Sequence, residues 1–66
     1  MRKTKVLVHQ ILPGAKFKLG GGLYEVTEVE EVRDRYFCLS FFFLEDEWRA
    51  SKFLILPGDR RFIIYD

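Results

Sequence analysis

The stretch Tyr36-Phe37-Cys38-Leu39-Ser40-Phe41-Phe42-Phe43-Leu44 decides the fold of this chain. It contains no charge, glycine or proline, and its aromatic side chains suit a pleated sheet. Because alternate residues of a strand point to opposite faces, one face of this run is wholly apolar and the other is mixed. The apolar face consists of Phe37, Leu39, Phe41 and Phe43.

Such a run would promote aggregation if it lay at the edge of a sheet. We therefore expect residues 36–44 to form a central strand that is paired on both sides. At about 3.3 Å per residue the run would reach roughly 30 Å, which is long for a strand. We expect a strand of this length to bend and to serve two halves of a barrel.

The length of the chain, 66 residues, predicts a single domain over residues 1–66. The only cysteine, Cys38, excludes an internal disulfide, and together with the only histidine, His9, it cannot complete a structural zinc site. We expect no metal and no cofactor, and stability that comes from dense aromatic packing. Cys38 is best explained as a small buried hydrophobic side chain in a reducing compartment.

The amino-terminal residues 1–5 are basic, but no apolar region of a signal peptide follows them. No stretch approaches the roughly 20 apolar residues that a membrane helix needs. We expect a cytoplasmic protein that does not contact a membrane.

Turn signals divide the rest of the chain into short strands. Strands are expected over Thr4–Ile11, Ala15–Leu19, Leu23–Val32 and Arg61–Tyr65, separated by turns at residues 12–14, 20–22, 33–35, 45–47 and 57–60. The apolar phase slips around Thr27-Glu28, which predicts a β-bulge. These elements indicate an all-β fold, a small barrel or roll of five to six antiparallel strands.

The segment Trp48–Leu56 begins polar and ends apolar. We expect a strand in which Phe53 and Ile55 point inward. A short helical turn from Glu45 to Lys52 is the alternative for its first part, because Asp46 could cap it.

Two blocks, Leu12-Pro13-Gly14-Ala15-Lys16-Phe17 and Gly21-Gly22-Leu23-Tyr24-Glu25-Val26, resemble a recurring opening of small prokaryotic and phage β-barrel domains. SH3-like barrels of the translation and transcription type look similar in this turn-and-strand pattern. The resemblance implies an SH3-like barrel of phage or mobile-element type. It does not imply an activity.

Catalysis needs a nucleophile or an acid–base pair with an orienting partner. His9 is a lone strand histidine, which is usually structural, and the carboxylates occur in runs typical of solvated surface. We therefore expect that the protein is not an enzyme.

The net charge of +1 conceals a segregation, because residues 1–20 carry basic and no acidic side chains whereas residues 21–47 are mainly acidic. Either a basic face stands opposite an acidic face, or strands of opposite sign pair and neutralise each other; we favour the second arrangement. The acidic middle segment could also present carboxylates to a basic partner, although its spacing does not select this role.

Two binding functions remain open. Protein contact, with a partner or a second copy of the chain, would use an apolar patch formed by Phe42, Leu44 and Trp48. Nucleic-acid binding would use Trp48 with the basic residues Lys16, Lys18, Arg49, Lys52, Arg60 and Arg61. We favour protein contact, because so small a net charge can neutralise few phosphates.

Overall fold

Strand β4, Tyr36–Phe43, is an internal strand of the six-stranded sheet in the computed structural model, which describes residues 2–66. It pairs antiparallel with β3 (Gly22–Arg33) on one side and with β5 (Lys52–Pro57) on the other. The prediction of a central strand is confirmed. Its apolar run is thereby kept away from both edges of the sheet.

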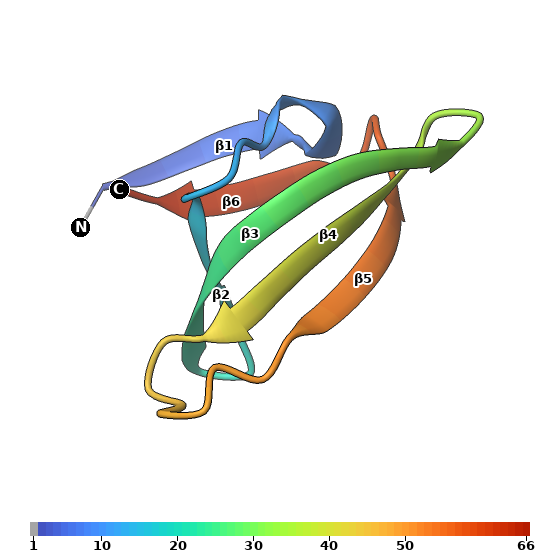
Figure 1. Cartoon of the computed structure of the whole chain (residues 1–66). Coiled ribbons are helices and arrows are strands. Elements are labelled where there is room, and N and C mark those ends of the chain that lie inside the picture. Colours follow the sequence, from blue (N-terminus) through green and yellow to red (C-terminus); the bar gives the residue numbers. More distant parts are fainter. Residues whose placement is uncertain (1) are drawn as a thin grey trace.

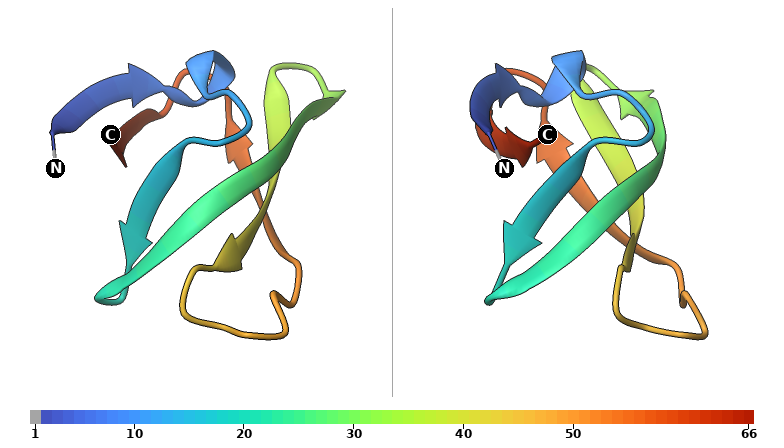
Figure 2. Two further views of the ribbon diagram at one scale, coloured as in Figure 1. Left: turned by 60° about the vertical axis from the view of Figure 1, so that its left-hand side comes forward. Right: turned by 90° about the vertical axis from the view of Figure 1, so that its left-hand side faces the viewer.

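The remaining strands extend this sheet and curl it (Figure 1). They are β1 (Lys3–Leu7), β2 (Lys16–Leu19) and β6 (Arg61–Tyr65). The strand order is β1-β6-β2-β3-β4-β5, with antiparallel pairing throughout. The two further views in Figure 2 show the sheet wrapping around an interior, with β5 and β6 diverging from the turn that joins them. The fold is a small all-β barrel or roll, as expected from the sequence.

The strand that bends is β3 and not β4 (Figure 1). β3 pairs with β2 through Gly22–Glu25 and with β4 from Tyr24 to Arg33. A register shift between Val26 and Glu28 is the bulge that the sequence predicts, and a second irregularity lies between Glu31 and Arg33. An extra residue in one strand increases its local twist, so the bulges allow β3 to serve both halves of the barrel.

The first strand is shorter than expected, because β1 ends at Leu7 and the 3-10 turn η1 (Val8–Gln10) follows it. The Leu7 N–H donates to Oε1 of Gln10 at 2.8 Å. The N–H groups of Val8 and His9 donate to the carbonyls of Arg60 and Gly58 at 2.9 and 3.0 Å. Backbone hydrogen bonds therefore fasten η1 to the turn between β5 and β6, and Val8 is fully buried beneath it.

The core is centred on Phe17, whose ring contacts three other aromatic rings. The ring centres of Phe41, Phe62 and Tyr24 lie 5.0, 5.1 and 5.6 Å from that of Phe17. Leu39 and Phe41 are buried on the predicted apolar face of β4, and Phe37 and Phe43 are half-buried. The face assignment for β4 is confirmed. The buried core residues are Val8, Ile11, Phe17, Val26, Leu39, Phe41 and Leu56.

The face assignment for β5 is wrong. Phe53 and Ile55 are 66% and 52% exposed, whereas Leu54 and Leu56 point inward. The register explains the inversion, because Leu54 lies opposite Leu39 and Phe53 lies opposite Ser40 on the outer face of β4. Both sets of alternating residues in this strand are apolar, so the alternation alone does not show which set is buried.

Candidate functional site

Phe42 lies on the outer face of β4 but is only 7% exposed. Cζ of Arg49 lies 5.1 Å from the centre of its ring, which is the geometry of a cation–π contact. The expectation that Phe42 is exposed is therefore wrong. The loop that follows β4 returns over this face and places the Arg49 guanidinium on the ring.

The carboxylate of Asp46 holds this loop in place. Its Oδ1 accepts a hydrogen bond from the Trp48 N–H at 3.0 Å, and its Oδ2 accepts one from the Ala50 N–H at 3.1 Å. The capping role expected of Asp46 is thus present, but it closes a turn and no helix forms between Glu45 and Lys52. Arg49 takes a positive φ of 51° at this turn.

Replacing Asp46 should loosen the loop and expose Phe42. Asp46→Ala removes both acceptors, and we expect it to lower the free energy of unfolding by about 1–2 kcal/mol. Amide hydrogen exchange should accelerate at Trp48 and Ala50. The control is Glu47→Ala, at an exposed neighbour, which should change neither quantity. Unaltered exchange at both amides in Asp46→Ala would contradict this account of the loop.

The three residues expected to form an apolar contact patch do not form one. Leu44 is half-buried, and its N–H donates to the Leu23 carbonyl at 3.0 Å. Trp48 is 85% exposed and borders a shallow hollow together with Glu47. Of the three, Trp48 alone presents a largely exposed side chain.

A different apolar surface lies beside β5. It consists of Val32, Tyr36, Phe53 and Ile55, all exposed, and we call it the β5 apolar edge. Val32, Tyr36 and Ile55 border one hollow, and Phe53 lies two residues before Ile55 on the same outer face of β5. Half-buried Cys38 lies opposite Ile55 and continues the apolar surface onto β4. The inverted phase of β5 is the reason that the sequence analysis missed this surface.

The β5 apolar edge coincides with an unpaired strand edge, because β5 pairs only with β4. The Gly58 N–H donates to the Arg35 carbonyl at 2.6 Å, just beyond the last residue pair of the β4–β5 ladder. Since hydrogen-bonded pairs alternate in an antiparallel ladder, the N–H groups of Leu54 and Leu56 point toward β4. Those of Phe53 and Ile55 consequently point to the open edge.

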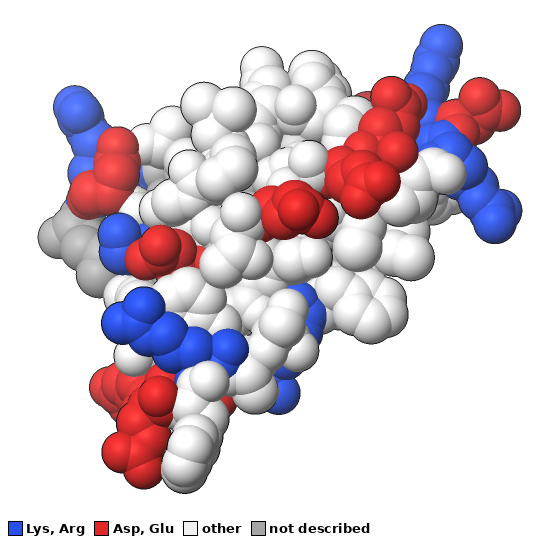
Figure 3. All heavy atoms as spheres, in the orientation of Figure 1, with Lys and Arg blue, Asp and Glu red and all other residues white. Residues whose placement is uncertain are grey.

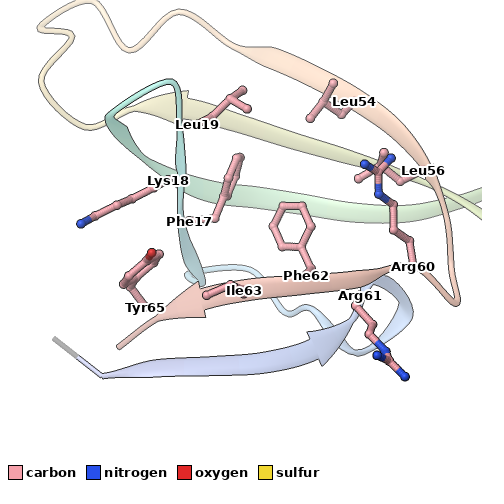
Figure 4. Close-up of a pocket in the computed structure, with 10 residues that line it drawn as sticks. All are labelled: Phe17, Lys18, Leu19, Leu54, Leu56, Arg60, Arg61, Phe62, Ile63 and Tyr65. Atoms are coloured by element: carbon pink, nitrogen blue, oxygen red, sulfur yellow. The ribbon is translucent and has the colours of Figure 1, made fainter.

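A groove lies on the inner face of β5, between β5 and β6, and opens into the barrel (Figure 4). Its volume is about 470 Å³. Figure 4 shows Phe17, Leu54 and Phe62 directed into this space, with Leu19 beside them. Lys18 lies at one end of the groove, and Arg60 and Arg61 lie at the other. Among the described residues the lining contains these basic side chains and no acidic one.

The structure brings together only part of the basic set that the sequence analysis assigned to nucleic acid. Lys18, Arg60 and Arg61 share the groove. Lys16 Nζ lies 4.0 Å from Glu25 Oε1, and Arg49 covers Phe42. Lys52 begins β5, outside the groove lining.

Stacking rings are also missing from this groove. Trp48 does not line it, and the rings of Phe17 and Phe62 pack against each other edge to face. Lys18 Nζ lies 4.8 Å from the centre of the Tyr65 ring and covers that ring. The basic residues and the exposed ring that nucleic-acid binding would combine are therefore separated.

Acidic side chains form a row along β3 in the space-filling view (Figure 3). Glu28 and Glu30 lie opposite Ser40 and Cys38, which carry no charge that could neutralise them. Within residues 2–66 the contact between Lys16 and Glu25 is the one ion pair. Neutralisation between strands, the arrangement favoured from the sequence, is limited to that contact.

The side chains with catalytic potential are dispersed. His9 is exposed at η1, and no group of three His, Cys, Asp or Glu side chains within residues 2–66 could hold a metal ion. No helix in the described part of the chain is long and apolar enough to span a membrane. What the described surface offers is apolar area, open strand edges and segregated charge.

No protein-family model matches the chain, and neither a curated protein nor a solved structure matches it.

Proposed function

We propose that the protein is a non-catalytic binding module that acts through protein–protein contact at the β5 apolar edge. The observation that carries this proposal is the exposure of Phe53 and Ile55 on a strand whose outer edge is unpaired. Soluble domains usually protect such edges with charge, bulges or a covering segment. On β5 the protection is limited to Lys52 at one end and Pro57 at the other.

A second copy of the chain is the partner that fits this edge directly. Two β5 strands that pair antiparallel about a two-fold axis join their free N–H and C=O groups into one continuous sheet. In this arrangement Phe53 of one copy lies near Ile55 of the other, and each covers apolar area that is exposed in the single chain. Charge repulsion is small, because Lys52 is the only charged residue of β5.

Sedimentation velocity over a range of protein concentrations tests this proposal. We expect the parent protein to form a dimer as its concentration rises. Phe53→Ser and Ile55→Thr should each raise the dissociation constant by about tenfold or more, because burial of a large apolar side chain contributes roughly 1.5–3 kcal/mol. Circular dichroism should show that both variants remain folded, since the two side chains are outside the core.

The matched control is Trp48→Ser, which removes an exposed ring outside the β5 apolar edge. This variant should dimerise like the parent. A parent protein that remains monomeric at high micromolar concentration, or a Trp48→Ser variant that alone loses the dimer, would contradict the assignment of this surface.

Nucleic-acid binding is the less supported alternative. The basic groove holds only part of the expected set and has no exposed ring for base stacking. We also retain two interpretations from the sequence, an SH3-like barrel type and a cytoplasmic location. The Pro13–Gly14 turn leading into β2 supports the first, and the free thiol of Cys38 supports the second.

A further inference from the structure

The groove between β5 and β6 is bordered by a second unpaired strand edge, which belongs to β6. β6 pairs with β1 from Arg61 to Tyr65, but its only residue pair with β2 is Lys16–Tyr65. From that pair onward β2 and β6 diverge (Figure 4), and the groove occupies the space between them. The edge of β6 next to Arg61 and Ile63 therefore has no strand beside it.

The direction of the free backbone groups follows from the hydrogen bonds at the end of the β1–β6 ladder. The N–H groups of Arg2 and Asp66 each donate to the other's carbonyl, at 2.8 and 3.0 Å. Because hydrogen-bonded pairs alternate, Phe62 and Ile64 also direct their N–H and C=O groups toward β1. Arg61 and Ile63 direct theirs into the groove, where an added strand could accept and donate hydrogen bonds.

The side chains around this edge set the chemistry of an added strand. Side chains on the inner face of the added strand would contact the apolar floor of the groove, which is formed by Leu19, Leu54, Leu56 and Phe62. Residues that it placed on the outer face would lie near Lys18 and Arg61. The basic residues of this groove have no carboxylate within 4.0 Å among the described residues.

We propose that this groove binds an extended peptide in which acidic and apolar residues alternate, and that the peptide adds as a strand to the free edge of β6. This inference rests on the proposed role as a protein-binding module, but it does not require self-association at β5. The peptide belongs to another protein, because the acidic strand of this chain, β3, is held in its own sheet by pairing with β4 from Tyr24 to Arg33. Attraction between the acidic residues of the peptide and the basic residues of the groove sets the register of the peptide along β6. The apolar floor of the groove buries the apolar side chains of the peptide.

The test uses a fluorescein-labelled synthetic peptide of alternating glutamate and valine, with fluorescence anisotropy as the readout of binding to the full chain. A lysine–valine peptide of the same length and an oligothymidylate are the comparison probes. We expect the glutamate–valine peptide to bind, with an affinity that falls as salt rises. Neither comparison probe should bind as tightly, and tighter binding of either one would overturn the proposal.

Charge reversal supplies a matched pair of variants. Arg61→Glu should weaken binding of the glutamate–valine peptide by roughly tenfold, because it places a like charge beside the bound strand. Arg33→Glu makes the same change in net charge at an exposed position on β3, outside the groove, and should bind like the parent. Equal weakening in both variants would overturn the proposal, because it would show attraction to net charge alone.

Amide hydrogen exchange separates this site from the self-association edge. Saturating peptide should slow exchange at Arg61 and Ile63 and leave Phe53 and Ile55 unchanged. Measuring the Phe53→Ser variant in parallel distinguishes the two proposals: peptide binding by a monomeric variant supports the groove by itself. A parent that dimerises but shows no protection at Arg61 and Ile63 with the peptide would overturn the groove proposal and leave the proposed function standing.

Discussion

Phe41→Ala should unfold most of the protein at room temperature. Phe41 is 2% exposed, and its ring contacts those of Phe17 and Tyr24 at centre distances of 5.0 and 5.4 Å. Removing a buried phenylalanine ring costs about 3–5 kcal/mol, which is comparable to the whole stability that one core of this size supplies. Circular dichroism and thermal unfolding measure the loss.

The matched control for this variant is Phe53→Ala, on the neighbouring strand β5. The same ring is removed there, but Phe53 is 66% exposed in the single chain, so at a concentration that keeps the protein monomeric we expect a change of less than about 1 kcal/mol. A cooperative Phe41→Ala variant with nearly parental thermal stability would show that the inner face of β4 is assigned wrongly.

Leu39→Ala should lower the free energy of unfolding by about 2–5 kcal/mol, because Leu39 is fully buried and its truncation leaves a cavity. Leu39 lies opposite Val29 on β3 and Leu54 on β5, so the cavity would open at the centre of three paired strands. Chemical denaturation measures the free energy of unfolding.

Ile55→Ala is the control for Leu39→Ala and also tests the corrected phase of β5. We expect a small effect on unfolding of the monomer, measured at low protein concentration, because Ile55 is half exposed on the outer face. If Ile55→Ala were as destabilising as Leu39→Ala, the inward assignment made from the sequence would be correct and the register of the structure would be wrong.

The parts of the fold that the sequence predicts are those with a strong local signal. The uncharged run 36–44 requires a central strand, and β4 is paired on both sides. The phase slip at Thr27-Glu28 locates the bulge between Val26 and Glu28. Turn residues likewise locate the segment Pro57–Arg60 before β6, because proline and glycine restrict the backbone in defined ways.

The parts that could not be predicted depend on contacts between distant segments. The first strand ends at Leu7 because the backbone of Val8 and His9 bonds to the β5–β6 turn, far along the chain. Burial of Phe42 requires Arg49 to return over its ring, which depends on the turn that Asp46 closes. Neither contact leaves a periodic pattern in the sequence.

The candidate site was predicted least well, for a related reason. Phe53 and Ile55 could be distinguished from Leu54 and Leu56 only by the β4–β5 register, which their composition does not determine. The gathering of Lys18, Arg60 and Arg61 likewise depends on β2 and β6 lying on either side of one groove. The segregation of basic and acidic residues along the chain suggested neutralisation between strands, but Glu28 and Glu30 lie opposite the uncharged Ser40 and Cys38.

The most direct test of the proposed function is amide hydrogen exchange along β5 as a function of protein concentration. If a second copy adds to this edge, the amides of Phe53 and Ile55 should become protected as the concentration rises. Leu54 and Leu56, whose N–H groups already point toward β4, should be protected at every concentration. Fast exchange at Phe53 and Ile55 that does not change from dilute to near-millimolar protein would contradict self-association at this edge.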